Sequence, residues 1–188
     1  KMNIPQIRFK GFEGEWERNV LSNIVTQIKS YSLSRGVESD KPTNVKYIHY
    51  GDIHIGKARL LTSDLNLSFV DINMDYVPLK KGDLVLADAS EDYIGIAECC
   101  VIDFDPKIDI VAGLHTIGIR PKINQDPVFF YYNFKTDMFK KHCYRVGTGM
   151  KVFGITFNNL SKYDGYFPVK KEQTQIGDFF QKIDQVIE

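Results

Sequence analysis

Three histidines and one aspartate could act as metal ligands or as acid–base groups. His49, Asp52 and His54 lie within six residues, and His115 lies far along the chain. Imidazole and carboxylate groups are common ligands of zinc and other transition metals. The sequence has no Cys-x-x-Cys or His-x-x-x-His spacing that would complete such a site. A small metal-dependent enzyme that uses His49, Asp52 and His115 is therefore one alternative.

A second group, Asp103 and Asp105 with Lys107, has the residue types of a nuclease centre. Pro106 stands inside this group, and its fixed backbone angle favours a turn at the end of a strand. The sequence lacks Gly-x-Gly-x-x-Gly, Gly-x-x-x-x-Gly-Lys-Ser/Thr and Gly-x-Ser-x-Gly, motifs that hold nucleotide phosphates or a nucleophilic serine. No catalytic set emerges, so we expect a protein that is not itself an enzyme.

Positive charge gathers in one short stretch of a chain with no net charge. The sequence has 24 basic and 24 acidic residues, yet five basic residues and one acidic residue lie between positions 135 and 151. A solvated helix face would explain such a run. The run also flanks Gly147-Thr148-Gly149, where the absence of side chains lets a ligand approach backbone N–H groups. Lysine and arginine beside such a loop are suited to bind phosphates.

A polar loop, Ser30-Tyr31-Ser32-Leu33-Ser34-Arg35-Gly36, carries a different kind of chemistry. Hydroxyl groups, an aromatic ring and a guanidinium group can hydrogen-bond to base edges in a groove of nucleic acid. Together the loop and the basic run favour a nucleic-acid ligand.

The overall composition is that of a folded chain without a membrane span. Hydrophobic residues make up 43% and aromatic residues 13% of the 188 residues, which excludes a disordered chain and suffices for the core of one domain. No apolar run reaches the roughly 18 residues of a membrane helix, and the first residues lack the apolar core of a secretory signal. Three cysteines, Cys99, Cys100 and Cys143, are typical of reduced thiols. We therefore expect a cytoplasmic protein.

A mixed set of strands and helices must position these groups. Residues 29–46 are polar and predict a long loop, while 20–28 fit either one helical face or a strand on each side of a short helix. Pro127 predicts the start of a helix that continues to about Tyr144. The predicted fold is a single β-rich α/β (α+β) domain with a C-terminal helix. Strands are predicted at 47–50, 84–87, 94–102, 108–112, 116–120 and 166–167, and a short element at 157–160.

An amphipathic stripe begins after Pro168 and continues to the last residues. Ile176, Phe179, Phe180, Ile183 and Ile187 follow one another at steps of 3, 1, 3 and 4, which is the spacing of one helical face. No glycine or proline ends the pattern. The sequence predicts a helix that is the first part of a longer one, in an excised domain or a naturally short form.

Five segments carry a resemblance to a known family. They are Pro5-Gln6-Ile7-Arg8-Phe9 with Gly14-Glu15-Trp16-Glu17, Tyr47-Ile48-His49-Tyr50-Gly51-Asp52-Ile53, Leu79-Lys80-Lys81-Gly82-Asp83-Leu84-Val85, Gly147-Thr148-Gly149, and Phe167-Pro168 followed by Glu172-Gln173 and Ile176. In this order they resemble motifs of the specificity subunit of type I restriction–modification systems. A complete subunit of that family has two recognition domains and two long helices, so the chain resembles half of one.

The resemblance implies sequence-specific recognition of one half of a bipartite DNA site. Residues 1–168 would form the DNA target recognition domain, and residues 169–188 the start of the conserved spacer helix. The implied partners are double-stranded DNA, modification subunits that methylate adenine, a restriction subunit that cleaves, and a second recognition domain in the same or another chain. This chain would hold no cofactor, whereas S-adenosylmethionine, ATP and Mg²⁺ would belong to the partner subunits.

Loop chemistry within this layout predicts the contact residues. Glu91 and Asp92 would be useful only as acceptors from cytosine amino groups, because carboxylates repel phosphates. A non-catalytic protein-interaction module that assembles through its tail is the other alternative. The candidates are Tyr31, Ser32, Ser34, Arg35, the turn Ala89-Ser90-Glu91-Asp92-Tyr93 and His115 for bases, Lys141, Arg145, Thr148 and Lys151 for phosphates, and Gln173, Ile176, Phe179, Phe180, Ile183 and Ile187 for a subunit interface.

Overall fold

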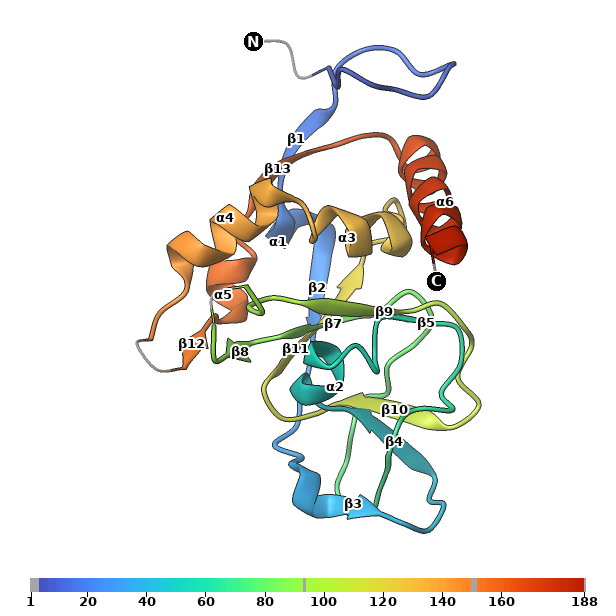
Figure 1. Cartoon of the computed structure of the whole chain (residues 1–188), viewed down its shortest axis with the longest axis vertical. Coiled ribbons are helices and arrows are strands. Elements are labelled where there is room, and N and C mark those ends of the chain that lie inside the picture. Colours follow the sequence, from blue (N-terminus) through green and yellow to red (C-terminus); the bar gives the residue numbers. More distant parts are fainter. Residues whose placement is uncertain (1–3, 93, 150–151, 188) are drawn as a thin grey trace.

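Five strands form the largest sheet of the computed structural model, which describes residues 4–92, 94–149 and 152–187. Neighbouring strands are antiparallel, except that β5 runs parallel to β9. The order across the sheet (Figure 1) is β2 (Val25–Ile28), β11 (Thr116–Pro121), β7 (Leu84–Ala87), β9 (Cys99–Ile102) and β5 (Leu60–Leu61).

The central strands β7 and β9 are apolar at every position because both of their faces are covered. Leu84 and Leu86 of β7 belong to one hydrophobic core, whereas Val85 between them belongs to a second core on the other face. Successive side chains of a strand point to opposite faces, so a strand that is buried on both sides needs a continuous apolar run.

A second sheet lies against the opposite face of the first and forms the lower part of Figure 1. Its strands β10 and β4 are parallel. Ile48 and Ile110 face the core that the two sheets share, and Tyr47 and Val111 face a third, smaller core. The order is β10 (Asp109–Ala112), β4 (Val45–Ile48), β6 (Phe69–Val70) and β3 (Glu38–Ser39).

Two aromatic-rich helices, α3 (Pro127–Asn133) and α4 (Asp137–Val146), cover the outer face of the large sheet. The prediction of one helix from Pro127 to about Tyr144 is wrong. Thr136 has an extended backbone, and its hydroxyl accepts from the N–H of Phe139 at 3.5 Å, so it caps the start of a second helix. The break lets Phe134 and Phe139 stack at 4.2 Å inside the core.

The N-terminal segment folds as a strand on each side of a short helix, which was one of the two predicted forms. β1 (Glu17–Val20) pairs with β13 (Asp164–Phe167), α1 (Leu21–Ile24) is a single turn, and β2 follows. The remaining elements are the 3₁₀ turn η1 (Arg35–Val37), α2 (Tyr50–His54), α5 (Phe157–Leu160), and β8 (Ala89–Ser90) paired with β12 (Phe153–Gly154).

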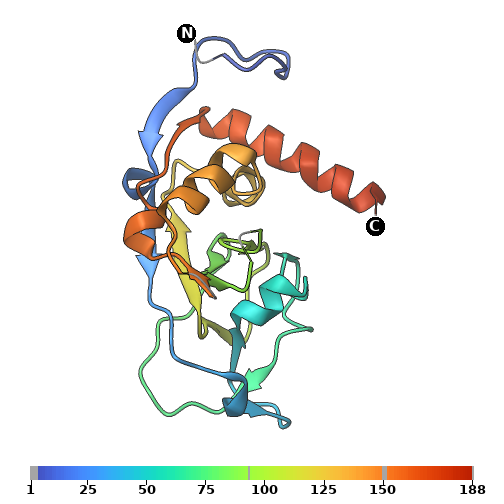
Figure 2. The ribbon, with the colours of Figure 1, turned by 60° about the vertical axis from the view of Figure 1, so that its left-hand side comes forward.

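The tail forms the helix α6 (Lys170–Ile187), as its apolar stripe predicts. Its first turns pack on α3, where a Cβ on Gly177 would lie 3.1 Å from the backbone nitrogen of Phe129. Figure 2 shows the last turns of α6 extending to the side of the domain. Phe179 and Phe180 are exposed by 46% and 43%, and Ile187 by 77%.

The prediction that Gln173 lies at a subunit interface is wrong for its side chain, which is 1% exposed. Its Oε1 accepts from the N–H of Asp126 at 2.8 Å, and its Nε2 donates to the carbonyl of Pro168 at 2.9 Å. Gln173 therefore joins α6 to its own domain.

Three predicted boundaries differ from the structure. The segment 29–46 is not a continuous loop, because it contains η1, β3 and the start of β4. The strand predicted at 47–50 is Val45–Ile48, and Tyr50 already begins α2. The strand predicted at 94–102 begins only at Cys99, after a turn in which Ala97 has φ +55°.

The turn before β7 is held by a buried carboxylate. Asp83 is fully buried, and it binds Arg120 with two hydrogen bonds of 2.7 Å and the N–H of Lys80 at 2.7 Å. Gly82 has φ +89° and lies close to Pro127, so the turn needs a glycine there. The conspicuous Lys-Gly-Asp motif thus positions a strand of the large sheet.

We expect Asp83→Asn to lower the free energy of unfolding by roughly 2–3 kcal/mol, because Arg120 would lose a buried charged partner. The estimate is below the range for a fully buried pair because the Arg120 side chain is 37% exposed. Urea denaturation at neutral pH measures the change. Asp105→Asn, at an exposed position, is the control and should change it by less than roughly 0.5 kcal/mol. Equal losses in the two variants would contradict this role for Asp83.

Candidate nucleic-acid interface

The short helix α2 is built by a reciprocal pair of caps. Nδ1 of His49 accepts from the N–H of Gly51 at 3.1 Å, and Oδ2 of Asp52 accepts from the N–H of His49 at 3.1 Å. The two side chains thus satisfy donors at the start of the helix that no helical carbonyl can reach.

Asp52 also carries a charge that is fully buried. Its Oδ1 lies 2.9 Å from Nη2 of Arg35 and 3.6 Å from Nζ of Lys57. Arg35 in turn lies 2.7 Å from Glu38, which accepts from the hydroxyl of Tyr47 at 2.6 Å. One ion network therefore ties the polar loop to α2 and β4.

An aromatic cluster stands beside this network, at the end of α2. The ring of Tyr50 lies 4.6 Å from that of His49, 5.7 Å from that of His54 and 5.3 Å from that of His115. His115 comes from the turn between β10 and β11, and Nδ1 of His115 lies 3.3 Å from Oδ1 of Asp88. Burial raises the pKa of Asp88, and the neighbouring His115 opposes that rise.

His115 has a backbone φ of +55°, which is rare for a residue with a side chain. Its side chain is half exposed to solvent. Strained residues of this kind concentrate at functional sites, so the position of His115 is consistent with a ligand contact.

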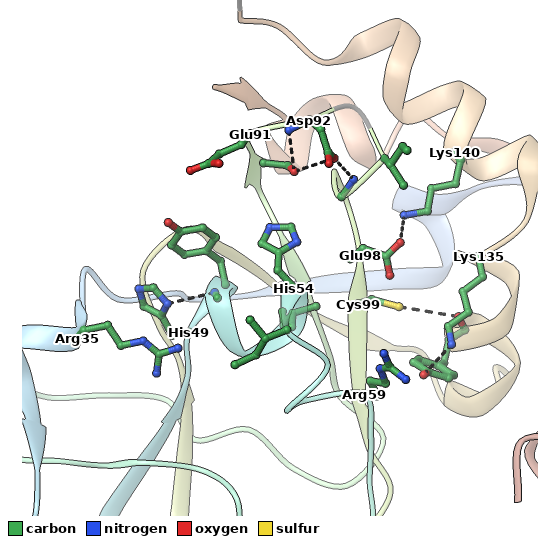
Figure 3. A pocket seen from close by; sticks show the side chains of 18 residues that line it. Arg35, His49, His54, Arg59, Glu91, Asp92, Glu98, Cys99, Lys135 and Lys140 are labelled. Atoms are coloured by element: carbon green, nitrogen blue, oxygen red, sulfur yellow. Dashed lines mark hydrogen bonds and ion pairs between the residues drawn. The ribbon is translucent and has the colours of Figure 1, made fainter. Parts of the chain in front are cut away.

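A cleft of about 970 Å³ opens between α2, residues 90–92 and 94–99, and the helices α3 and α4 (Figure 3). Glu91 and Asp92 lie at one end, and Arg59 and Lys135 lie together at another. Nζ of Lys140 lies 2.7 Å from Oε1 of Glu98. The charged and imidazole groups that line it are Arg35, His49, His54, Arg59, Glu91, Asp92, Glu98, Lys135 and Lys140.

The cleft brings together several of the predicted base contacts from separate segments. Arg35, Ser90, Glu91 and Asp92 line it, and His115 packs on Tyr50 at its edge. Ser32 and Ser34 are exposed on the polar loop. Tyr93 lies outside the described residues.

Two of the predicted contacts are mostly hidden from solvent. Tyr31 is 6% exposed, and its hydroxyl accepts from the N–H of Val77 at 2.6 Å. The prediction that its side chain contacts a base is wrong for this structure, because its aromatic ring belongs to the third core. Ser90 is 7% exposed, and its hydroxyl is engaged by Asp92.

The predicted phosphate contacts that the structure describes, Lys141, Arg145 and Thr148, do not line the cleft. Lys141 and Arg145 line a separate hollow of about 360 Å³ on the other side of α4, with Tyr163 and Asp164. Neighbouring residues of a helix point about 100° apart, so Lys140 faces the cleft while Lys141 faces away. Thr148 is exposed and bridges to Gly154. Lys151 lies outside the described residues.

Sequence patterns did not single out Arg59, His54 or Tyr50 as part of one site with Lys135. Lys135 and Lys140 belong to the basic run, and the 3.6-residue period of α4 could have separated Lys140 from Lys141. Arg59 has no such signal, because only the pairing of β5 with β9 brings it to the cleft.

The described residues supply no set of ligands for the alternative metal site at His49, Asp52 and His115. Within the described parts of the chain, no group of three or more His, Cys, Asp and Glu side chains could hold a metal ion. Nδ1 of His49 and both oxygens of Asp52 already accept or pair with other groups. In the same ranges, no helix is both long and apolar enough to cross a membrane.

Comparison with known proteins gives one family. The family model described as "Type I restriction modification DNA specificity domain" matches residues 15–188. No curated protein sequence matches the chain.

Solved structures share the fold at low sequence identity. The chain is similar to a structure reported for complex assembly and conformational transition of the type I R-M system (14% identity, TM-score 0.65), covering 97% of this chain and 41% of that one. It is also similar to an S subunit from M. genitalium, with 12% identity and a TM-score of 0.61, covering 98% of this chain and 42% of that one. The HsdS subunit from Thermoanaerobacter tengcongensis is similar too, with 13% identity and a TM-score of 0.62, covering 98% of this chain and 40% of that one. The chain thus spans about two fifths of the length of these proteins.

The cap of α2 predicts a pH dependence of stability. Burial, followed by the charge of Arg35, lowers the pKa of His49 below its usual 6.5, so the unfolded chain takes up this proton at a higher pH than the folded one. The free energy of unfolding should therefore fall as pH falls through about 6.5 towards 5. Urea denaturation at several pH values measures it.

His49→Asn keeps an oxygen that can cap α2 but removes the titrating group. We expect a smaller decrease in stability between pH 7 and about 5. Part of the decrease should remain, because burial also lowers the pKa of His142. An unchanged pH profile in the variant would rule out this role for His49.

Proposed function

The chain belongs to the family of type I restriction–modification DNA specificity domains, and from that premise we propose that it recognises one half of a bipartite DNA site. The match of the family model to residues 15–188 is the observation that carries the proposal. The likeness to S subunits supports the assignment of the fold, and the cleft is the proposed place where DNA would bind.

Base recognition needs donors and acceptors that rigid elements hold at the surface. Arg35 can donate to guanine, and its orientation is set by Asp52 and Glu38. His115 can donate or accept, depending on its protonation. Glu91 and Asp92 are exposed, acceptor-only groups suited to a cytosine amino group.

We propose that the chain itself catalyses no reaction. His49 and Asp52, the groups an enzyme would need, hold α2 and the polar loop in place. In the proposed complex, modification subunits bind S-adenosylmethionine and methylate an adenine, and a restriction subunit uses ATP and Mg²⁺ to cleave. We place this assembly in the cytoplasm.

The outer face of α6 is the proposed contact with those subunits or with a second recognition domain. Phe179, Phe180 and Ile187 are exposed apolar side chains there. Ile183 is partly buried, and Ile176 packs against the first core, so Ile176 supports the helix from inside the domain.

Exchange of this domain in the complete system tests the function. We expect the methylation map of cells that carry the exchanged domain to change in one half-site and to keep the other, because each domain would read its own half. Loss of all methylation would require a check that the subunits still assemble. An unchanged target in an active complex would overturn the proposal and favour an interaction module.

A single substitution tests the proposed base contact of His115 at the edge of the cleft. We expect His115→Ala to relax the preference at one position of the half-site by about 1–3 kcal/mol, the usual effect of one specific base contact. Methylation mapping measures the preference at each position. The matched control is Lys122→Ala, at an exposed position outside the cleft, and it should leave the preference unchanged. The same preference in the His115 variant would exclude this contact.

A further inference from the structure

Arg59 and Lys135 lie together at the junction of two hollows. Both residues line the large cleft, and both also line an adjoining hollow of about 470 Å³ that extends to Gln181 and Gln185 of α6. Figure 3 shows the two side chains in the same corner of the cleft. Tyr131 lines both hollows between them.

Lys135 is held in place by its aromatic neighbours. Its Nζ donates to the hydroxyl of Tyr131 at 2.7 Å, and lies 3.9 Å from the centre of that ring and 5.5 Å from that of Tyr132. Its backbone N–H bonds to the carbonyl of Tyr132 at 3.1 Å, in the turn between α3 and α4. The ammonium group therefore has a defined position although the residue is exposed.

The guanidinium group of Arg59 lies in space that Gly56 leaves open because glycine has no side chain. A Cβ on Gly56 would lie 2.7 Å from both Nε and Nη2 of Arg59, and Gly56 has φ +74°. The carbonyl of Arg59 accepts from the N–H of Val101 at 2.9 Å, which fixes its backbone to β9. Burial raises the pKa of the Tyr131 phenol and the charge of Arg59 opposes that rise, as expected of a cation close to the ring.

Neither cation has a carboxylate partner among the residues that the structure describes. Arg8, Arg18, Arg35 and Arg120 each bind a carboxylate. Two carboxylates that line these hollows have other partners. Glu98, in the cleft, binds Lys140 at 2.7 Å, and Asp184, in the adjoining hollow, accepts from the hydroxyl of Tyr132 at 2.8 Å.

Two like charges held beside one ring repel each other, and an anion between them would remove that cost. We propose that Arg59 and Lys135 bind a phosphate of the DNA backbone, next to the bases that the cleft contacts. The inference rests on the proposed function. An open groove that continues to α6 suits a phosphate within a polymer, because a free phosphate ion would fill only the corner.

Binding of a labelled duplex of random sequence tests the site, because phosphate contacts do not depend on sequence. We expect Arg59→Ala and Lys135→Ala each to weaken binding roughly tenfold at low salt, and to reduce the slope of log affinity against log salt by about 1. Lys107→Ala, at an exposed position that does not line the cleft, should keep the affinity and slope of the unaltered chain. Fluorescence anisotropy over a series of salt concentrations provides both quantities.

Two further variants separate charge from folding. Lys135→Arg keeps the charge and should retain most of the affinity. Gly56→Ala keeps Arg59 but displaces its guanidinium group, so binding should weaken in the same direction as in Arg59→Ala. Circular dichroism of each variant checks that the domain is folded, and only folded variants are compared.

The possible outcomes distinguish this site from the proposed function. If the unaltered chain binds no duplex and domain exchange leaves the methylation target unchanged, the proposed function fails. If it binds but folded Arg59 and Lys135 variants keep its salt slope, only the phosphate site fails. If inorganic phosphate binds at the site but DNA affinity does not depend on Arg59 or Lys135, the corner is an ion site only, and the inference is overturned. In the complete system, the double variant should lower methylation without changing the half-site.

Discussion

The buried carboxylate of Asp52 is the constraint on which the candidate interface depends. A charge with no exposure to water is tolerated only if it is paired and hydrogen-bonded, and Asp52 meets this need with Arg35, Lys57 and the backbone of His49. The polar loop, the helix α2 and the segment after it must therefore meet at one point. That meeting forms one wall of the cleft and places Arg35 and the Tyr50 cluster on the surface beside it.

The same arrangement, a buried carboxylate paired with an arginine, occurs at two further places, and all three places lie in segments that resemble a family motif. Asp83 binds Arg120 and holds the turn before β7. Glu172 is 1% exposed and binds Arg8, which joins the N-terminal segment to α6. These acids stabilise the scaffold, whereas the side chains proposed to contact DNA are exposed. Apart from Arg35, which pairs with Asp52 and is also a proposed base contact, the proposed DNA contacts can change without altering the ion pairs that maintain the fold.

Sequence patterns predicted the elements whose signal is local. The strands at 84–87 and 116–120, the element at 157–160 and the tail helix were found because apolar spacing and turn residues act within a few positions. The break at Thr136 was missed because a single capping hydroxyl decided it. Tyr31 and Gln173 were placed at the surface for a different reason. A polar residue in a polar segment looks exposed until a distant partner, such as the backbone of Val77 or Asp126, is known.

The sequence by itself determined the family, the mixed α/β class and the kinds of side chain available, because ordered motifs and periodic apolar residues are properties of the chain alone. Only the tertiary structure decided which of those side chains share a site. It placed Arg59 beside Lys135 and put Lys141 on another face of α4. The physical reason is that a binding surface is assembled from segments far apart in sequence, and the strand pairings and helix packing that join them depend on contacts that no local pattern contains.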